Sequence, residues 1–260
     1  MTTPLPASRN TRRYGWLPDL PDQRDHIYAA PPPVLMTLPS QVDLRDGCPK
    51  EIYEQGKLGS CTANAIGAAF EFDKIKQGLV DFMPSRLFIY YNERVIGNTV
   101  ECDSGAQIRD GIKTVAAQGA CSELSWPYDI TRFREQPPQP CYDEASRSRA
   151  VAYKRVTRTL NQLRGVLAEG YPFVFGFQVY DSFESDEVAE TGCVPMPSAG
   201  EQPLGGHAVL AVGYDDATGR FLIRNSWGVA WGDGGHFTLP YAYLTERGLS
   251  SDFWAIVEVS

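Results

Sequence analysis

The chain has 260 residues, of which 43% are hydrophobic and 12% aromatic, so it can bury a substantial core in one domain or in two lobes that share an interface. Its net charge of −8 disfavours contact with phosphate backbones, and because no run of Lys and Arg is interleaved with aromatic residues, we expect no nucleic-acid partner. No apolar stretch reaches the length that spans a bilayer, so we expect a soluble chain without a transmembrane segment.

Residues 1–37 form an N-terminal arm whose composition differs from that of the rest of the chain. The arm is rich in proline and charged residues and has little periodicity, which predicts an extended segment. Residues 14–21 carry bulky apolar side chains that a solvated tail would not need, so we expect them to dock on the body of the protein. Residues 1–10 lack the apolar run of a secretory signal, and the cysteine content leaves the cellular compartment open.

The first half of the body shows the period of helices. Small or apolar residues recur at helical spacing from Cys61 to position 75, and Gly78 is a suitable C-terminal stop. The pattern also predicts helices over Ile108–Gln118 and Leu160–Glu169.

After residue 170 the pattern changes to short β-branched or aromatic runs bounded by Gly, Asp and Pro. We expect strands over 173–179, 208–214, 221–224, 236–239 and 253–259. Residues 215–220 read as a hairpin connection. Helices followed by strands predict an α+β protein with a helical lobe over about 45–150 and a β lobe over about 151–260.

Cys61 stands at the predicted start of a helix. The unpaired N–H groups and the positive end of the helix dipole favour the thiolate, which is the nucleophilic form. Gly56 and Gly59 allow a tight turn that brings backbone donors near the sulfur. Taken alone, the segment suits a small buried hydrophobic residue equally well.

His207 and Asn225 could complete a nucleophilic site. His207 is one of three histidines and opens a predicted strand, and Asn225 ends the strand that follows. If the two strands pair as a hairpin, both side chains lie at the same open end, where Asn225 could fix the imidazole tautomer. Trp227 could shield that hydrogen bond from water. Either residue by itself is more often structural than catalytic.

Taken together, the motifs resemble the papain and cathepsin family. They are Gln55 six residues before the cysteine, Gly59-Ser60-Cys61, His207-Ala208, Val212-Gly213-Tyr214 and Asn225-Ser226-Trp227-Gly228 followed by Trp231-Gly232. His207 follows Cys61 by 146 residues, within the roughly 130–150 typical of this family. The resemblance covers residues 38–260, which would form the peptidase domain.

The resemblance implies a papain-like two-lobe fold, with a helical left lobe and an antiparallel, β-barrel-like right lobe that enclose an active-site cleft. It implies a cysteine endopeptidase that hydrolyses peptide bonds through a thioester on Cys61. His207 would be the base and Asn225 its orienting residue. The Gln55 side chain and the Cys61 backbone N–H would form the oxyanion hole.

The resemblance also implies which residues bind substrate. They are Ser104, Gly105, Ala106, Gly176, Gly205, Gly206 and Trp227. Ser104-Gly105 would hydrogen-bond an extended substrate backbone, and the Gly206 carbonyl would accept a further bond. Ala106, Gly176 and Gly205 would wall the S2 pocket, and because all three are small, we expect a roomy pocket that accepts bulky apolar or aromatic side chains.

Several positions depart from the family pattern. Thr62 stands where the family has an aromatic residue, and Leu58 replaces a cysteine whose usual partner resembles Cys102. The arm of residues 1–37 is too short for a full inhibitory pro-domain, which indicates a short-armed bacterial subgroup of the xylellain type. We expect the arm to lie in the cleft as a short inhibitory segment.

Two other functions stay open on sequence alone. One is a catalytically impaired, papain-like peptide-binding protein, and the other is an acyl or peptidyl transferase with the same Cys–His chemistry. No cluster of His, Cys and Asp has the spacing of metal ligands, so we expect neither a metal nor another cofactor. We expect a monomer whose partners are a peptide or protein substrate and its own arm.

Overall fold

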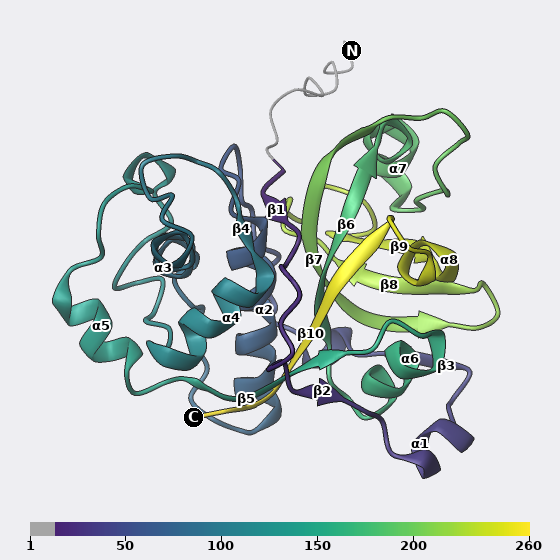
Figure 1. Ribbon diagram of the computed structural model, residues 1–260, viewed down its shortest axis with the longest axis horizontal. Coiled ribbons are helices and arrows are strands. Elements are labelled where there is room, and N and C mark those ends of the chain that lie inside the picture. The colour runs from purple at the N-terminus through teal and green to yellow at the C-terminus, as the bar shows by residue number, and fades with distance from the viewer. Residues whose placement is uncertain (1–13) are drawn as a thin grey trace, which may run out of the picture.

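The computed structural model describes residues 14–260, which form two lobes side by side (Figure 1). One lobe is helical and the other is built on a β-sheet. Helix α2 (Cys61–Lys76) contacts the other helices of its own lobe and also strands of the sheet. The expected α+β, two-lobe architecture is therefore confirmed.

The helical lobe is organised around α2. The other helices of this lobe are α3 (Arg86–Ile96), α4 (Ile108–Ala117) and α5 (Gln139–Ala145). Every residue of α2 from Cys61 to Lys74 is buried, which its many small side chains permit. Gly78 follows the helix with a left-handed φ of 67°, so it ends α2 as the sequence predicts. Ser85 caps α3 by accepting a hydrogen bond from the Phe88 N–H.

The sheet lobe has eight strands. In pairing order they are β2 (Ile27–Tyr28), β5 (Ala150–Val156), β10 (Ser250–Val259), β6 (Phe173–Tyr180), β7 (Pro203–Asp215), β8 (Arg220–Arg224) and β9 (His236–Pro240), with β3 (Gln41–Asp43) paired to β7. This lobe also carries α6 (Leu160–Ala168), α7 (Asp186–Thr191) and α8 (Tyr241–Thr245). Short 3-10 helices cover Arg45–Gly47, Ile130–Arg132 and Asp181–Glu184. Among the described strands the pairing path stays open, so the barrel-like lobe does not close completely.

Strand β7 is longer than the sequence predicts, and this changes the place of His207. We expected His207 to open a strand over 208–214. In the structure β7 begins at Pro203, and His207 lies inside it, opposite Phe177 of β6. A Pro- and Gly-containing segment with no strand signal is extended here because the neighbouring strand pairs with it.

The described part of the arm runs between the two lobes (Figure 1). Strand β1 (Trp16–Leu17) pairs in parallel with β4 (Ala106–Gln107) of the helical lobe, and β2 pairs in parallel with β5 of the sheet lobe. Helix α1 (Pro32–Met36) then contacts α6. Residues 14–21 therefore dock as their composition predicts, whereas residues 1–13 lie outside the described part of the chain.

Ion pairs add to the contacts of the arm with both lobes. The Asp25 carboxylate lies 2.6 Å from the Arg109 guanidinium of α4 and 2.9 Å from the Arg155 guanidinium of β5. Asp25 and Arg109 have little side-chain exposure, so this contact is screened less than a surface pair. One arm carboxylate thus joins a helix of one lobe to a strand of the other.

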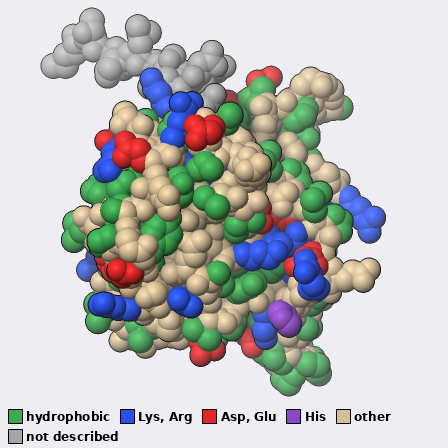
Figure 2. Space-filling view, turned by 60° about the vertical axis from the view of Figure 1, so that its left-hand side comes forward, with side chains coloured by type: hydrophobic (Ala, Val, Ile, Leu, Met, Phe, Trp, Pro, Cys, Tyr) green, Lys and Arg blue, Asp and Glu red, His purple; other side chains and the backbone are tan. Residues whose placement is uncertain are grey.

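The surface in Figure 2 carries acidic and basic side chains next to one another, with apolar side chains between them. No region of a single sign covers this face of the molecule. Among residues 14–260, no helix is both long enough and apolar enough to cross a bilayer.

Candidate active site

Cys61 is the first residue of α2 and has no exposed surface. The loop before it is fixed by Asp103, whose carboxylate accepts a 3.0 Å hydrogen bond from the Gly59 N–H. The Tyr90 hydroxyl donates a 2.5 Å hydrogen bond to the same carboxylate. The thiol is therefore held at a helix N-terminus by contacts from α3 and from the loop that contains Asp103.

The environment of the Cys61 sulfur acts on its pKa in two directions. Burial is the larger effect, and it raises the pKa of the thiol to about 12. Hydrogen bonds from the backbone N–H groups of Ala208, Gly15 and Thr62 lower the pKa. Gly15 belongs to the arm, so the thiol is buried in part by the protein's own N-terminal segment.

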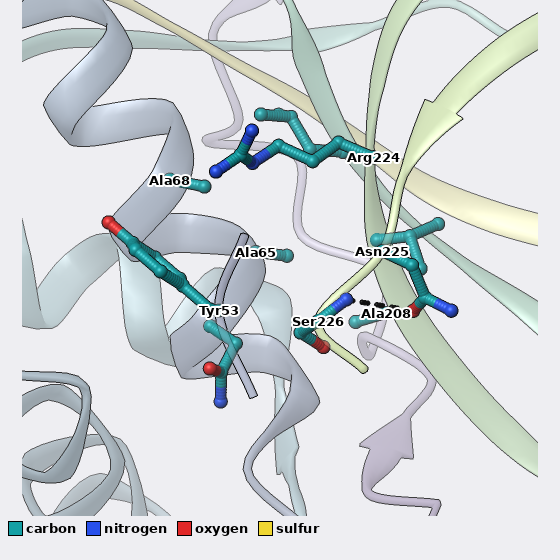
Figure 3. Close-up of a pocket in the computed structure, with 10 residues that line it drawn as sticks. Tyr53, Ala65, Ala68, Ala208, Arg224, Asn225 and Ser226 are labelled. Carbon is teal, nitrogen blue, oxygen red and sulfur yellow. Dashed lines mark hydrogen bonds between the residues drawn. The ribbon is translucent and has the colours of Figure 1, made fainter. Parts of the chain in front are cut away.

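His207 and Asn225 are joined by a hydrogen bond of 2.9 Å between His207 Nε2 and Asn225 Oδ1. Asn225 follows directly on β8, which pairs with β7, so the two side chains come from neighbouring strands. Asn225 Oδ1 also accepts from the Ser226 N–H at 2.9 Å, drawn in Figure 3, which assigns the oxygen of the amide to this position. His207 Nε2 is then the donor, and Nδ1 is the basic nitrogen of the neutral ring.

Trp227 covers this hydrogen-bonded pair. Its ring stacks on the His207 ring with 4.9 Å between centroids and 27° between planes. Phe183 packs against the edge of the same indole, at 5.5 Å between centroids. Because the aromatic layer keeps water away, the His207–Asn225 bond lies in surroundings of low dielectric constant, where it orients the imidazole more firmly.

Gln55 is buried and is attached to the segment that carries Asn225. Its side-chain amide donates to the Leu58 carbonyl at 3.0 Å, and its Oε1 accepts from the Ser226 hydroxyl at 2.7 Å. A backbone bond from the Gln55 N–H to the Ser226 carbonyl, 2.9 Å long, runs beside it. Figure 3 shows Asn225 and Ser226 leaving the end of β8 close to Ala65 of α2. The residues expected to be catalytic therefore converge where α2 meets the sheet.

The arm passes directly over this site. The Gly15 carbonyl accepts a 2.8 Å hydrogen bond from the Ala106 N–H, and a Cβ on Gly15 would lie 1.8 Å from the Gly59 carbonyl oxygen. Only glycine can approach the backbone so closely. The preceding Tyr14 packs edge-on to His207 at 6.2 Å between centroids and donates a short hydrogen bond to Glu184.

Trp16 fills the place expected for the S2 pocket. A Cβ on Gly176 would lie 2.0 Å from its indole ring, and a Cβ on Gly206 would lie 2.6 Å from it. Ala106 is the partner of Trp16 in the β1–β4 pair. Gly205 instead faces Tyr14, with 3.0 Å between its would-be Cβ and the tyrosine side chain, so Gly206 lines the indole site where we expected Gly205.

Ser104 and Gly105 lie just before the residues that pair with the arm. Gly105 has a φ of 72°, and a Cβ there would lie 2.1 Å from the Gly15 carbonyl oxygen. The Ser104 hydroxyl donates to the carbonyl of Gly105 at 3.1 Å. The stretch expected to bind a substrate backbone is thus in contact with the arm.

Two buried carboxyl groups near the site were not identified from the sequence. Glu93 of α3 accepts a 2.6 Å hydrogen bond from the Thr62 hydroxyl, one residue after Cys61. Asp252 of β10 accepts a 3.2 Å hydrogen bond from the Trp16 indole N–H. No local signal marked them, because Glu93 stands between Asn92 and Arg94 and Asp252 follows two serines, and the sequence does not show what either residue faces.

Comparison with known proteins identifies the family. The model of the papain family cysteine proteases matches residues 38–254. The chain belongs to the papain family of cysteine proteases. An uncharacterized peptidase C1-like protein of Acanthamoeba polyphaga mimivirus is 42% identical to this papain-family chain over 280 aligned residues, covering 98% of this chain and 90% of the viral protein.

A solved structure and a mammalian relative support the same family. The crystal structure of xylellain, a cysteine protease from Xylella fastidiosa, matches this papain-family chain with a TM-score of 0.88 and 42% identity, covering 97% of this chain and 98% of that one. Cathepsin S from Mus musculus is 29% identical over 231 residues, which are 83% of this chain and 62% of the mouse protein. The family and the similarity to xylellain expected from the sequence are confirmed.

This papain-family protein is a hydrolase and a cysteine endopeptidase, as the sequence predicts. The two other functions that the sequence left open, a peptide-binding protein without catalysis and an acyl transferase, are not favoured by these similarities. Papain-family enzymes act on peptide substrates, so a peptide or protein is the substrate class.

Proposed function

We propose that Cys61 is the nucleophile, His207 the general base and acid, and Asn225 the residue that orients His207. The observation that carries this assignment is the His207–Asn225 hydrogen bond of 2.9 Å, which fixes the ring nitrogen that remains for the thiol. With Nε2 engaged by Asn225, His207 Nδ1 is the nitrogen that exchanges a proton with Cys61 Sγ.

The proposed reaction has two stages. The Cys61 thiolate attacks the scissile carbonyl carbon, and the oxyanion is held by the Cys61 N–H and the Gln55 side-chain amide. The imidazolium of His207 then gives its proton to the departing amine, which leaves a thioester on Cys61. In the second stage His207 takes a proton from water, the hydroxide attacks the thioester, and the free acid leaves as Cys61 recovers its proton.

A peptidase assay with an internal cysteine control tests these roles. A fluorogenic peptide should be cleaved by the wild-type chain and not by Cys61→Ser, which replaces only sulfur by oxygen. Cys102→Ser is the matched control, because Cys102 is exposed and lies outside the site, and it should retain wild-type activity. Turnover by Cys61→Ser at the wild-type rate would contradict the assignment.

We also propose that the arm inhibits the enzyme by lying in the substrate path. Gly15 contributes to the burial of the Cys61 thiol, Tyr14 packs against His207, and Trp16 covers Gly176 and Gly206. A substrate backbone that is to reach the sulfur needs the same space. The arm must therefore leave, or be displaced, before a peptide can be cleaved.

The direction of the arm explains why the arm is not itself cleaved by Cys61. In a substrate, the residue in the S2 pocket comes before the residue whose carbonyl is attacked. In the arm, Trp16 in that pocket comes after Gly15, which lies at the sulfur. The arm therefore runs opposite to a substrate, and its carbonyl groups do not take the position of a scissile bond.

Full-length point variants test the inhibition. Trp16→Ala removes the largest side chain of the arm from the cleft and should raise kcat/KM for a small peptide by at least about tenfold, because a buried aromatic ring contributes several kcal/mol to docking. Leu20→Ala is the matched control on the same arm, since Leu20 is 71% exposed, and it should leave kcat/KM unchanged. If Trp16→Ala lowered only the melting temperature, the arm would be structural.

We propose further that the enzyme acts as a monomer and does not bind nucleic acid. The net charge of −8 and the mixture of charges on the face in Figure 2 support the absence of nucleic-acid binding. Light scattering and a titration with duplex DNA at low salt would test it.

A further inference from the structure

Trp16 occupies a flat site made by adjacent strands of the sheet. Its indole lies over the bare Cα atoms of Gly176 on β6 and Gly206 on β7, where any Cβ would meet the ring. The edge of the ring that carries the N–H points to β10, where the Asp252 carboxylate accepts at 3.2 Å. Two glycines thus make room for an aromatic ring, and a carboxylate accepts a hydrogen bond from the N–H group of that ring.

The backbone of Asp252 is held in an uncommon conformation. Its φ is 59°, the left-handed region, and it lies at an irregularity where β10 loses register with β6 between Ser251 and Trp254. Bulges next to active sites redirect side chains, and strained residues persist only where the surrounding structure fixes them. Here the irregularity turns a carboxylate inward, and Asp252 is only 2% exposed.

The two oxygens of Asp252 have different partners. Oδ1 accepts from the Arg155 guanidinium at 3.0 Å, within the sheet lobe. Oδ2 accepts from the Trp16 indole at 3.2 Å and from the Asp19 N–H at 2.8 Å, and both of these donors belong to the arm. Departure of the arm therefore removes both of these donors from Oδ2, whereas the Arg155 bond and the hydrogen bond from the Ser251 side chain stay in place.

A buried carboxylate oxygen that has lost its donors favours a ligand that replaces them. The replacement must fit over Gly176 and Gly206, so it must be flat and large. Because Arg155 already balances the charge of Asp252, a neutral N–H donor suits the oxygen better than a second cation. An indole meets all three requirements, as Trp16 demonstrates.

We propose that Asp252 determines specificity, and that the enzyme prefers substrates with tryptophan at P2, the residue before the one whose carbonyl is attacked. This inference rests on the proposed function of the cleft and on the arm filling the pocket that a substrate side chain would enter. The preference is for a ring with an N–H donor and not for apolar bulk alone.

A pair of isosteric peptides tests this directly. One carries Trp at P2, and the other carries 3-benzothienylalanine, in which sulfur replaces the indole N–H without changing the ring shape. We expect kcat/KM to be about tenfold higher for the Trp peptide, since a hydrogen bond to a charged group contributes roughly that factor. Both peptides are measured on the same protein, so the fraction of molecules with a displaced arm is the same for both and cancels from the ratio of the two kcat/KM values. Full-length Trp16→Ala can be used to increase the signal.

The matched variant is Asp252→Gly, which removes the acceptor and tolerates the left-handed φ. On Trp16→Ala/Asp252→Gly the ratio should fall to about one. If the two peptides are cleaved by Trp16→Ala with equal kcat/KM, the proposal is overturned without any variant of Asp252. It is also overturned if a peptide with Lys at P2 is cleaved faster than the Trp peptide. Unchanged discrimination in a folded Asp252→Gly protein would also overturn it.

Binding separates failure of this inference from failure of the proposed function. On full-length Trp16→Ala/Cys61→Ala, the same two peptides are titrated by calorimetry, and the expected tenfold difference then appears in Kd. If no peptide is cleaved by Trp16→Ala but the Kd ratio is present, the proposed catalytic roles fail and the pocket assignment stands. If peptides are cleaved and neither ratio departs from one, only the role of Asp252 fails.

Discussion

The Thr62 hydroxyl donates a 2.6 Å hydrogen bond to Glu93, so the residue directly after Cys61 is attached to a buried carboxyl group of the neighbouring helix. Burial raises the pKa of Glu93 to about 8, while the hydrogen bond from Thr62 and the charge of Arg94 oppose the rise and Asp110 adds to it. The carboxyl group is thus protonated over much of the range in which a protease works.

This shift gives stability a pH dependence. Because the pKa of Glu93 in the folded chain lies above the ordinary value of 4.5, its contribution is complete below pH 4.5 and is lost as pH rises towards 8. We expect Glu93→Gln to remove a slope of roughly 1.4 kcal/mol per pH unit from the free energy of unfolding between these limits. Denaturant melts of both proteins at pH 5 and pH 8 measure it, and parallel pH profiles would refute the assignment.

The thiol of Cys61 should react slowly while the arm is docked. Burial raises the pKa of this thiol, and Cys61 has no exposed surface. Brief treatment with iodoacetamide at pH 5.5 should therefore leave Cys61 unlabelled in the wild-type chain. Trp16→Ala should increase its labelling by at least about tenfold, because an open site restores the thiolate–imidazolium pair. Peptide mapping reads the result, with the exposed Cys102 and Cys193 as internal controls that should label equally in both proteins.

Docking of the arm should weaken as pH rises. Burial raises the pKa of Asp19 to about 6, the charge of Asp252 adds to the rise, and the Trp254 and Arg109 bonds oppose it. When the arm is released, the pKa of Asp19 would return to 3.8, so between pH 3.8 and about 6 the Asp19 carboxyl group is protonated only while the arm is docked. The free energy of docking therefore becomes less favourable by roughly 1.4 kcal/mol per pH unit across this range. Basal activity of the full chain should therefore increase from pH 4 to pH 6.

The control for this effect is Asp19→Asn, which stays neutral at every pH. At each pH, the basal activities of the wild-type chain and of Asp19→Asn are each divided by the activity of an arm-weakened variant such as Trp16→Ala. The ratio for the wild-type chain should rise with pH, and the ratio for Asp19→Asn should stay constant. Equal slopes for the two proteins would assign the pH dependence to another group.

Substitutions of the four residues proposed to be catalytic should differ in the size of their effects. Cys61→Ala and His207→Ala should abolish turnover, because each removes a group that forms or breaks a bond. Gln55→Ala should lower kcat by about 10²–10³-fold with little change in KM, as expected of a donor used mainly in the transition state. Asn225→Ala should be the mildest, and a folded Asn225→Ala protein as inactive as His207→Ala would reverse this order.

Local sequence was enough to identify the family and to propose the residues of the site. Cys61 at a helix start and His207 and Asn225 on neighbouring strands follow from period and turn signals, which are properties of short segments. The hairpin over 215–220 then brings His207 and Asn225 together, since β7 and β8 pair as the sequence predicts. The resemblance of these motifs to papain supplied the fold, which the comparisons confirm.

Only the tertiary structure decided which residues face the cleft from far along the chain. Trp16 and Asp252 are 236 positions apart, and nothing in either segment indicates that one donates a hydrogen bond to the other. The left-handed φ of Asp252 occurs where the register between β10 and β6 is interrupted, and the extension of β7 back to Pro203 depends on pairing with β6, so neither follows from the residues' own preferences. Packing and strand register determine these contacts, and a local pattern carries no information about a partner that another part of the chain brings to it.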